Sequence, residues 1–192
     1  VSQYIYNPLH MEHFINGRKL FLNYPSTCEE IILGAGCFWG VERLFWQLEG
    51  VWVTYVSYSG GRRDNPSYEQ VCAGVTGHAE TVNVIFDPQI ITTAEILKIF
   101  WECHDPTQGM RQGNDIGEQY RSVIYCKNQA QYNSAIESKE TFQKLLTRKG
   151  YGNITTEIEF ANKSFPAEEY HQQYLGKNPN GYCNLKGTGC FL

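Results

Sequence analysis

The stretch Gly34-Ala-Gly-Cys-Phe-Trp-Gly40 places a cysteine where an apolar run meets a helical pattern. Cys37 would then lie in the first turn of a helix, where unpaired backbone N–H groups and the helix dipole stabilise an anion. We expect this position to lower the pKa of the thiol below the free value of about 8.5 and to activate it as a nucleophile. Two aromatic residues, Phe38 and Trp39, follow directly beside it. The alternative is an inert buried thiol, since free cysteines are often buried.

Glu80 is the candidate for proton transfer. It ends the motif Gly77-His-Ala-Glu80 at the start of a predicted strand, where a carboxylate can face a cleft. Burial against aromatic residues would raise its pKa above the free value of about 4.3 and make it a general acid. A solvated glutamate at a strand edge is the alternative. His78 offers a different chemistry, because a histidine base beside Cys37 would indicate a Cys-His hydrolase or transferase.

Two polar loops carry tyrosines near their ends. Tyr68 closes the segment Asn65-Pro-Ser-Tyr68, and Tyr120 lies near the end of the polar segment 113–121. Loops this polar in a compact domain tend to carry function. A single tyrosine is nevertheless more often a packing residue than a proton donor.

The C-terminal segment carries two of the seven cysteines, Cys183 and Cys190, on a glycine-rich backbone. We expect such cysteines not to fill a core but to pair with each other or to reach a thiol elsewhere, as a disulfide relay requires. A metal site made of these two cysteines and a histidine is a competing idea, and a non-enzymatic thiol sensor is another. The chain has no Cys-x-x-Cys pair, so the usual spacing of zinc ligands is missing.

Composition narrows the class of protein. The chain has 192 residues, of which 42% are apolar and 19% charged, and its formal net charge is −4. These values are typical of one folded domain and exclude a disordered chain, a collagen and a coiled coil. The negative charge disfavours nucleic-acid and anionic-membrane partners. The sequence contains neither a membrane-spanning apolar run nor a secretory leader pattern, so we expect a cytoplasmic protein, with an organelle or the periplasm as alternatives.

Hydrophobic periodicity predicts the elements that position these residues. From residue 30 the order is β-α-β-β-α-β, followed by α-β-α and a tail, which predicts an α/β (α+β) protein with a ferredoxin-like split βαβ core. Its helices would form one layer on a mixed sheet. The predicted strands are 30–35, 51–58, 79–86, 120–126 and 154–160, and the predicted helices are 38–48, 68–71, 92–103, 129–148 and 167–175.

We divide the chain into three parts. We expect residues 1–29 to form an N-terminal extension, residues 30–175 the main domain with Cys37 and Glu80, and residues 176–192 a mobile tail that carries Cys183 and Cys190. Within the extension, Asn16-Gly17 lies between two apolar stretches and predicts a type I′ hairpin turn.

Together these motifs resemble those of the A-type peptide methionine sulfoxide reductases. The matching segments follow the family's order from about Glu30 to the C-terminus, with no departure at the motif positions. They are Gly36-Cys-Phe-Trp-Gly40, Gly77-His-Ala-Glu80, Asn114-Asp115 with Gln119-Tyr-Arg121, and Gly181-Tyr-Cys183. Both tail cysteines are present, as in the subgroup that uses three cysteines, and the extension resembles that of longer bacterial members.

The resemblance implies reduction of the S epimer of methionine sulfoxide to methionine. Cys37 would attack the sulfoxide sulfur and end as a sulfenic acid. Because oxide is a poor leaving group, the oxygen needs a proton. Glu80 would supply it, with Tyr68 and Tyr120 as hydroxyl donors beside it.

The resemblance also implies the shape of the substrate site. Phe38 and Trp39 would hold the ε-methyl group of the substrate, and Asp115 would help to order the site. The substrates would be free methionine sulfoxide and oxidised proteins. No metal and no organic cofactor would be required.

A disulfide relay completes the implied cycle. Cys183 would attack the Cys37 sulfenic acid to form a disulfide, and Cys190 would pass this disulfide to the tail. Thioredoxin, or dithiothreitol in its place, would then reduce the Cys183–Cys190 bond. The expected protein is a monomer.

Overall fold

A mixed six-stranded sheet forms the centre of the computed structural model, which describes residues 10–192. Its strand order is β7-β6-β1-β3-β2-β8, and all neighbours are antiparallel except the parallel pair β6 and β7. The strands are β1 (Glu29–Ala35), β2 (Val51–Ser59), β3 (Ala79–Phe86), β6 (Ser122–Cys126), β7 (Glu157–Phe160) and β8 (Ser164–Pro166). A separate hairpin consists of β4 (Arg111–Gln112) and β5 (Asp115–Ile116).

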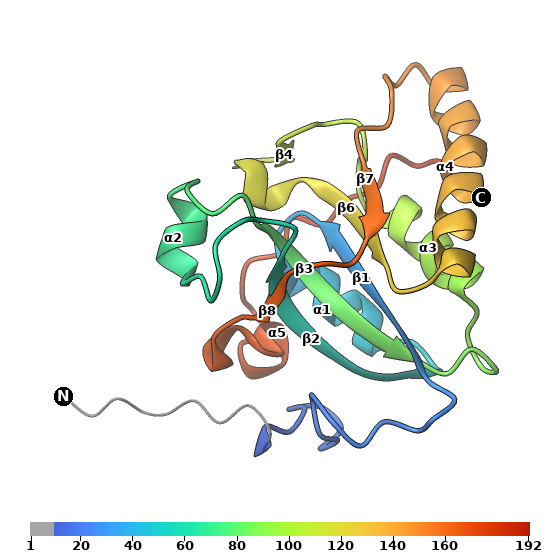
Figure 1. Cartoon of the computed structure of the whole chain (residues 1–192). Coiled ribbons are helices and arrows are strands. Elements are labelled where there is room, and N and C mark those ends of the chain that lie inside the picture. Colours follow the sequence, from blue (N-terminus) through green and yellow to red (C-terminus); the bar gives the residue numbers. More distant parts are fainter. Residues whose placement is uncertain (1–9) are drawn as a thin grey trace.

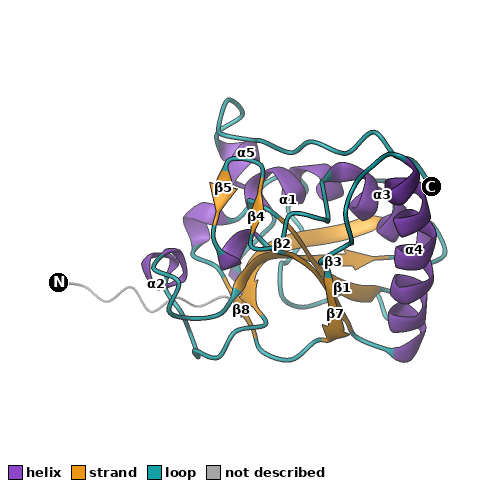
Figure 2. Ribbon diagram, turned by 90° about the horizontal axis from the view of Figure 1, so that it is seen from above, coloured by secondary structure: helices purple, strands orange, loops and turns teal. Residues whose placement is uncertain are grey.

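Three helices cover one face of this curled sheet, as Figures 1 and 2 show. They are α1 (Phe38–Trp46), α3 (Thr93–Cys103) and α4 (Gln129–Arg148). Each contributes a fully buried phenylalanine to the core that it shares with the sheet, namely Phe45, Phe100 and Phe142. The predicted α/β arrangement of helices on a mixed sheet is therefore confirmed. Two short helices, α2 (Tyr68–Cys72) and α5 (Tyr174–Lys177), complete the set of five.

Local sequence signals explain where the long elements begin. Thr92 caps α3 in a reciprocal capping box with Glu95, and the Asn128 side chain accepts from the Gln131 N–H at the start of α4. Every residue of β3 is buried, because β1 and β2 flank it on both sides. The predicted bounds of β3 and α4 agree with the structure.

Apart from the strand expected over 154–160, which begins only at Glu157, three local predictions differ from the structure. The strand expected from residue 120 begins at Ser122, because the 3-10 helix η2 (Glu118–Tyr120) precedes it. The helix expected over 167–175 is divided into the 3-10 helix η3 (Glu169–His171) and α5, since Gln173 adopts a left-handed conformation with φ 48°.

The turn expected at Asn16-Gly17 is the third difference. Gly17 has a positive φ of 71°, but among the described residues Asn16 is not one of those with positive φ, which a type I′ turn requires at both positions. Instead, the Gly17 N–H donates to the His13 carbonyl at 2.8 Å, and one bridge joins Glu12 to Lys19. The segment still doubles back, through a wider loop.

The C-terminal segment lies against α3 and α4. The Thr188 carbonyl accepts from Lys149 Nζ at 3.2 Å, and the Leu192 carbonyl accepts from Lys98 Nζ at 2.8 Å. Cys190 is only 7% exposed and belongs to the main core. The expectation that neither tail cysteine fills a core is therefore wrong for Cys190. Gly187 explains why, because a Cβ there would lie 2.1 Å from the Glu102 carbonyl oxygen, so only glycine lets the chain approach this closely.

The approach of β1 to β6, just before Cys37, makes a testable prediction for Gly34. A Cβ at this position would lie 2.7 Å from Val123 Cγ2 and 3.1 Å from the Glu80 carbonyl oxygen. We expect Gly34→Ala to lower the free energy of unfolding by about 1–3 kcal/mol through overpacking, measured by urea denaturation. Gly152→Ala is the matched control, because nothing lies within 4 Å of a Cβ there. Equal stabilities of the two variants would contradict the prediction.

Candidate active site

A cavity of about 130 Å³ lies where β1 meets α1. Side chains from α1, α2, β3, β5, η2 and the C-terminal tail converge on it. Its lining residues are Cys37, Phe38, Trp39, Tyr68, Glu80, Asp115, Tyr120 and Tyr182. All of these except Tyr182 were candidates from the sequence, so the structure brings seven predicted residues together in one small space.

Cys37 is the N-cap residue of α1, as its place in the sequence predicted. The chain enters this position through Gly36, whose φ of 96° favours glycine. A Cβ on Gly36 would also lie 2.9 Å from the Gln112 side chain. The Trp39 backbone N–H, one of the free donors of the first helical turn, lowers the pKa of the thiol, although the Cys37 side chain makes no capping hydrogen bond.

The expected low pKa of Cys37 is wrong for the protein without substrate. Burial raises the pKa of this thiol well above its ordinary value, and the carboxylate of Glu80 adds to the rise. The Trp39 N–H opposes both effects but does not outweigh them. Helix-terminus stabilisation is weaker here than the cost of desolvating a thiolate, so the resting enzyme holds Cys37 as a thiol.

Glu80 is 2% exposed and reaches the same helix terminus. Its Oε1 accepts from the Phe38 backbone N–H at 3.2 Å. Burial raises its pKa to about 8, and this exceeds the lowering by the Phe38 N–H and the Gln119 side chain. The carboxyl is therefore protonated at neutral pH, as a general acid requires.

The two tyrosines keep their protons over the whole physiological range. Burial, the largest cause, raises the pKa of both Tyr68 and Tyr120, and the charge of Glu80 adds to each rise. The Tyr68 backbone N–H donates to Glu168 Oε2 at 2.9 Å and so anchors the start of α2. Both tyrosines line the cavity.

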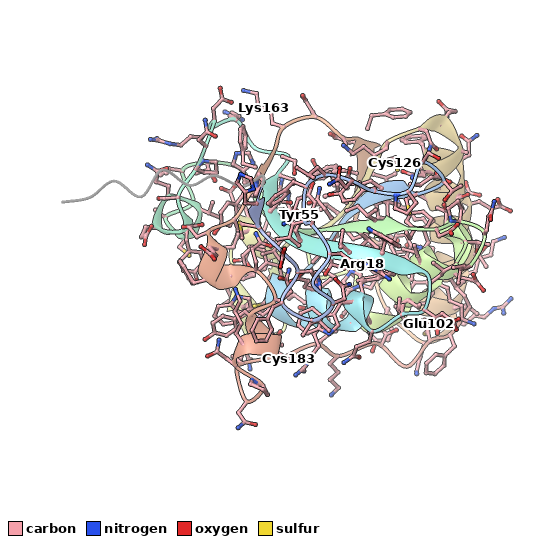
Figure 3. All side chains as sticks on the ribbon, turned by 90° about the horizontal axis from the view of Figure 1, so that it is seen from below. Arg18, Tyr55, Glu102, Cys126, Lys163 and Cys183 are labelled. Atoms are coloured by element: carbon pink, nitrogen blue, oxygen red, sulfur yellow. The ribbon has the colours of Figure 1, made fainter. Side chains whose placement is uncertain are left out.

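The tail brings Cys183 close to the helix that Cys37 caps. A Cβ on Gly40 would lie 2.6 Å from Cys183 Sγ, so the sulfur occupies the space that glycine leaves free on α1. Asp115 holds both neighbours of Cys183, because Tyr182 Oη donates to Oδ1 at 3.2 Å and Asn184 Nδ2 donates to Oδ2 at 3.0 Å. Cys183 is labelled in Figure 3.

Comparison with known proteins identifies the family of this site. Residues 29–189 match the family described as peptide methionine sulfoxide reductase. The chain belongs to this family. It is 55% identical over 185 residues to the peptide methionine sulfoxide reductase MsrA of Pseudomonas aeruginosa, covering 96% of this chain and 86% of that protein. The reductase therefore reduces methionine sulfoxide in peptides, and as an A-type enzyme it acts on the S epimer.

Solved structures support the same assignment. Methionine sulfoxide reductase A of Corynebacterium diphtheriae superimposes with a TM-score of 0.85 at 42% identity, over 95% of this chain and 90% of that one. Mxr1 of Saccharomyces cerevisiae in complex with Trx2 matches 80% of this chain and 90% of that one with a TM-score of 0.56. At 24% identity, the second comparison shows a likeness of fold alone.

Two residues of the site were not found from the sequence. Tyr182 lines the cavity and lies inside the Gly181-Tyr-Cys183 motif, which was the signal that could have identified it. Gln119 is buried, and its side chain bonds Glu80 while its Nε2 lies 3.4 Å from Cys72 Sγ. Its signal was its place in the Gln119-Tyr-Arg121 motif, directly before Tyr120.

The structure does not place the residues of the alternative functions, a Cys-His pair or a metal site, at this cavity. The ring of His78 is fully buried and does not line the cavity. Its Nδ1 accepts from the Gly61 N–H at 2.9 Å, and its Nε2 lies 2.6 Å from the Arg63 carbonyl, so both nitrogens are occupied by backbone groups. Over residues 10–192 no group of three or more His, Cys, Asp or Glu side chains could hold a metal ion. In the same range no helix has the length and apolar character to cross a membrane.

The pH dependence of the reductase follows from the two raised pKa values. If Cys37 attacks the sulfoxide as a thiolate while Glu80 donates a proton, the pair must hold one proton in total, because thiolate and acid must coexist. The pair holds two protons below the Glu80 pKa of about 8. We therefore expect kcat/KM for single-turnover methionine formation to rise roughly tenfold per pH unit up to about pH 8 and then level off.

Glu80→Gln is the matching variant. With no carboxyl to release the first proton, its rate should keep rising beyond pH 8, because Cys37 alone then titrates at higher pH. Its rate at pH 8 should also fall by roughly 10²–10⁴-fold. A parent rate that decreases between pH 6 and pH 8 would show that the thiolate forms before Glu80 ionises.

Proposed function

We propose that Cys37 is the nucleophile and Glu80 the proton donor of methionine-S-sulfoxide reduction. The observation that carries this proposal is that Cys37 is the N-cap of the helix whose Phe38 N–H donates to the Glu80 carboxyl, and that both residues line one cavity. Both groups can therefore act on the same sulfoxide, Cys37 on its sulfur and Glu80 on its oxygen. Cys37 attacks the sulfoxide sulfur, the oxygen passes to Cys37 as a sulfenic acid, and methionine leaves. Two electrons move from the cysteine to the sulfoxide.

The hydroxyls of Tyr68 and Tyr120 stabilise the oxygen during this transfer. Their protons stay bound because burial raises both pKa values, so they act as fixed donors rather than as acids. Glu80 supplies the proton that the oxygen keeps. Donors already in place where charge develops lower the barrier without reorganisation.

An aromatic wall holds the methyl group of the substrate. Phe38 and Trp39 line the cavity beside Cys37. The Trp39 ring stacks on Tyr174 with centroids 3.8 Å apart and planes 14° apart, and its Nε1 donates to His171 Nδ1 at 3.0 Å. The stacking holds the face of the Trp39 ring and the hydrogen bond holds its Nε1 edge, so the ring keeps one orientation in the cavity wall.

Replacement of the nucleophile tests the assignment directly. We expect Cys37→Ser to abolish methionine formation with any reductant, because a serine hydroxyl does not ionise in this range. Methionine release from a defined S-sulfoxide is measured by chromatography. Cys126→Ser, a buried thiol on β6 outside the cavity, is the control for loss of a cysteine. Retention of about a tenth of the parent activity in Cys37→Ser would refute the role.

A relay through the tail regenerates Cys37. Cys183 attacks the sulfenic acid of Cys37, a disulfide forms and water leaves. Asp115 assists by holding Tyr182 and Asn184 on either side of Cys183. Cys190 then exchanges with this disulfide, which requires the segment around Cys190 to leave its buried place, because thiol–disulfide exchange needs direct contact of the sulfurs.

Thioredoxin is the reductant of the resulting Cys183–Cys190 disulfide. Mxr1 in its reduced form is 36% identical to this chain, and its solved complex with Trx2 supports a thioredoxin as the partner. Dithiothreitol replaces it in vitro. No metal and no organic cofactor takes part, because the sulfoxide supplies the oxidising power and the thiols supply the electrons.

Cys190→Ser tests the relay. We expect a normal single-turnover rate of methionine formation, accumulation of a Cys37–Cys183 disulfide, and a fall of more than roughly tenfold in turnover with thioredoxin. Dithiothreitol should restore part of the turnover, since a small thiol reaches the first disulfide. Peptide mapping by mass spectrometry identifies the bond. Thioredoxin turnover at the parent rate would show that two cysteines suffice.

The remaining assignments belong to the same proposal. The inner strand order β6-β1-β3-β2 supports a ferredoxin-like split βαβ core. The N-terminal extension is residues 1–29, the catalytic domain residues 30–175 and the recycling tail residues 176–192. The protein acts as a cytoplasmic monomer on free and protein-bound methionine sulfoxide, without nucleic-acid or membrane partners. Seven free cysteines support a reducing compartment.

A further inference from the structure

A buried carboxylate lies outside the cavity, on the same helix as Cys37. Glu42 is fully buried and accepts three hydrogen bonds. The Gln173 backbone N–H donates to Oε1 at 2.8 Å, Gln173 Nε2 donates to Oε2 at 2.9 Å, and Thr54 Oγ1 donates to Oε2 at 2.7 Å. Burial raises the pKa of Glu42 to about 7, and the bonds from Gln173 and Thr54 oppose that rise. No step of the proposed mechanism uses this group.

Two of these bonds hold Gln173 in a conformation that is unfavourable for a residue other than glycine. Its φ is 48° and its ψ 42°, the left-handed region. This residue sets the angle between η3 and α5, because it lies between His171 and Tyr174 in the chain. These are the two residues that contact the Trp39 ring, His171 through Nδ1 and Tyr174 by stacking. The conformation of Gln173 therefore determines how both partners of Trp39 are presented.

The N-terminal segment reaches the same residue from the other side. The Phe14 backbone N–H donates to Gln173 Oε1 at 3.1 Å. The Ile15 side chain packs against Gly176 of α5, where a Cβ would lie 2.6 Å from Ile15 Cδ1. In Figure 1 this segment runs below α5 and β2, and Figure 3 shows Arg18 over β2, where it donates to the Trp52 carbonyl at 2.9 Å.

His13 is the last member of this hydrogen-bond network, and the direction of each of its bonds is determined by its neighbours. Thr54 Oγ1 gives its hydrogen to Glu42, so His13 Nε2, 3.0 Å away, must donate to Thr54. Its Nδ1 is then free to accept from the Ile15 N–H at 3.3 Å. Burial lowers the pKa of His13 to about 4, so the neutral ring with a proton on Nε2 is the stable form. In the hydrogen-bond network that links His13 to Gln173 through Thr54 and Glu42, every donor thus has an acceptor.

We propose that Glu42, together with residues 13–15, positions the Trp39–Tyr174 wall of the substrate site through Gln173. Glu42 is a positioning residue, since it touches neither substrate nor the reacting atoms. The N-terminal segment is then part of the substrate-binding apparatus. This inference rests on the proposed role of Trp39 in holding the substrate methyl group.

Glu42→Gln is the first test. The amide has the size of the acid but offers one acceptor oxygen to three donors, so Gln173 loses at least one of its two bonds. We expect KM for the sulfoxide in single-turnover experiments to rise on the order of tenfold, while the rate at saturation stays within about twofold of the parent, the pattern of lost uniform binding. Glu49→Gln, which removes an exposed carboxylate just after α1, is the matched control.

A spectroscopic readout reports the wall itself. The indole N–H resonance of Trp39, assigned with Trp39→Phe, senses its bond to His171 and the ring current of Tyr174. We expect Glu42→Gln to shift this resonance and to leave that of Trp101 unchanged, because Trp101 Nε1 donates to Ser138 Oγ between α3 and α4. A general loss of structure would instead move both resonances, and that result would contradict the proposal.

Phe14→Pro tests the N-terminal contact without touching the core. Proline removes the N–H that bonds Gln173 Oε1, and position 14 follows the first residue of the His13–Gly17 turn, where proline is tolerated. We expect KM to rise about fivefold, as for one lost hydrogen bond. Phe14→Ala keeps the N–H and should raise KM less. If Glu42→Gln does not fold, this pair of surface variants decides the question alone.

The outcomes separate this inference from the proposed function. Unchanged KM and an unmoved Trp39 resonance in both Glu42→Gln and Phe14→Pro would overturn the positioning role. An equal effect of Glu49→Gln or of Phe14→Ala would also overturn it. If Trp39→Ala left KM unchanged, the proposed methyl-binding role of Trp39 would fail, whereas a shifted Trp39 resonance in Glu42→Gln would still establish the structural link.

Discussion

The active site depends on the first turn of α1. An α-helix begins with backbone N–H groups that have no partner within the helix. Here the Phe38 N–H donates to the carboxyl of Glu80, and the Trp39 N–H favours the anionic form of Cys37. The two reactive groups come from different elements, yet this shared terminus fixes their separation. Gly36 and Gly40 allow the arrangement, because side chains there would meet Gln112 and Cys183. The sheet, the tail and the loops are arranged around this one terminus.

Burial gives the site its chemical state at rest. It raises the pKa of both Cys37 and Glu80, so these two groups are uncharged in the enzyme without substrate. In the proposed mechanism a polarised sulfoxide changes this balance, because its sulfur favours the thiolate and its oxygen takes a proton from Glu80. The reactive charge distribution therefore forms only when substrate is present, which limits side reactions of a free thiolate.

Sequence reasoning found most of the lining residues because short motifs carry them, but it failed where long-range packing decides. The low pKa expected for Cys37 rested on the helix terminus, whereas the opposing burial comes from five other segments that no local pattern reveals. The core position of Cys190 and the helix break at Gln173 have the same origin. Tertiary contacts with Leu145 and Glu42, far away in the chain, override what glycine-rich or helical patterns indicate locally. Long periodic elements such as β3 and α4 were predicted well, because each carries its own apolar face and end signals.

The buried position of Cys190 has a consequence for selectivity among oxidants. Peroxides and small disulfides react with thiols that they can reach, and the docked tail leaves only 7% of this residue accessible. In the resting enzyme this thiol, the last in the proposed relay, is therefore shielded from glutathionylation and from irreversible oxidation. This sulfur becomes accessible when the tail leaves its docked place during catalysis, and not in response to the redox state of the surroundings. The docked tail thus covers the cysteine that acts last in the proposed relay.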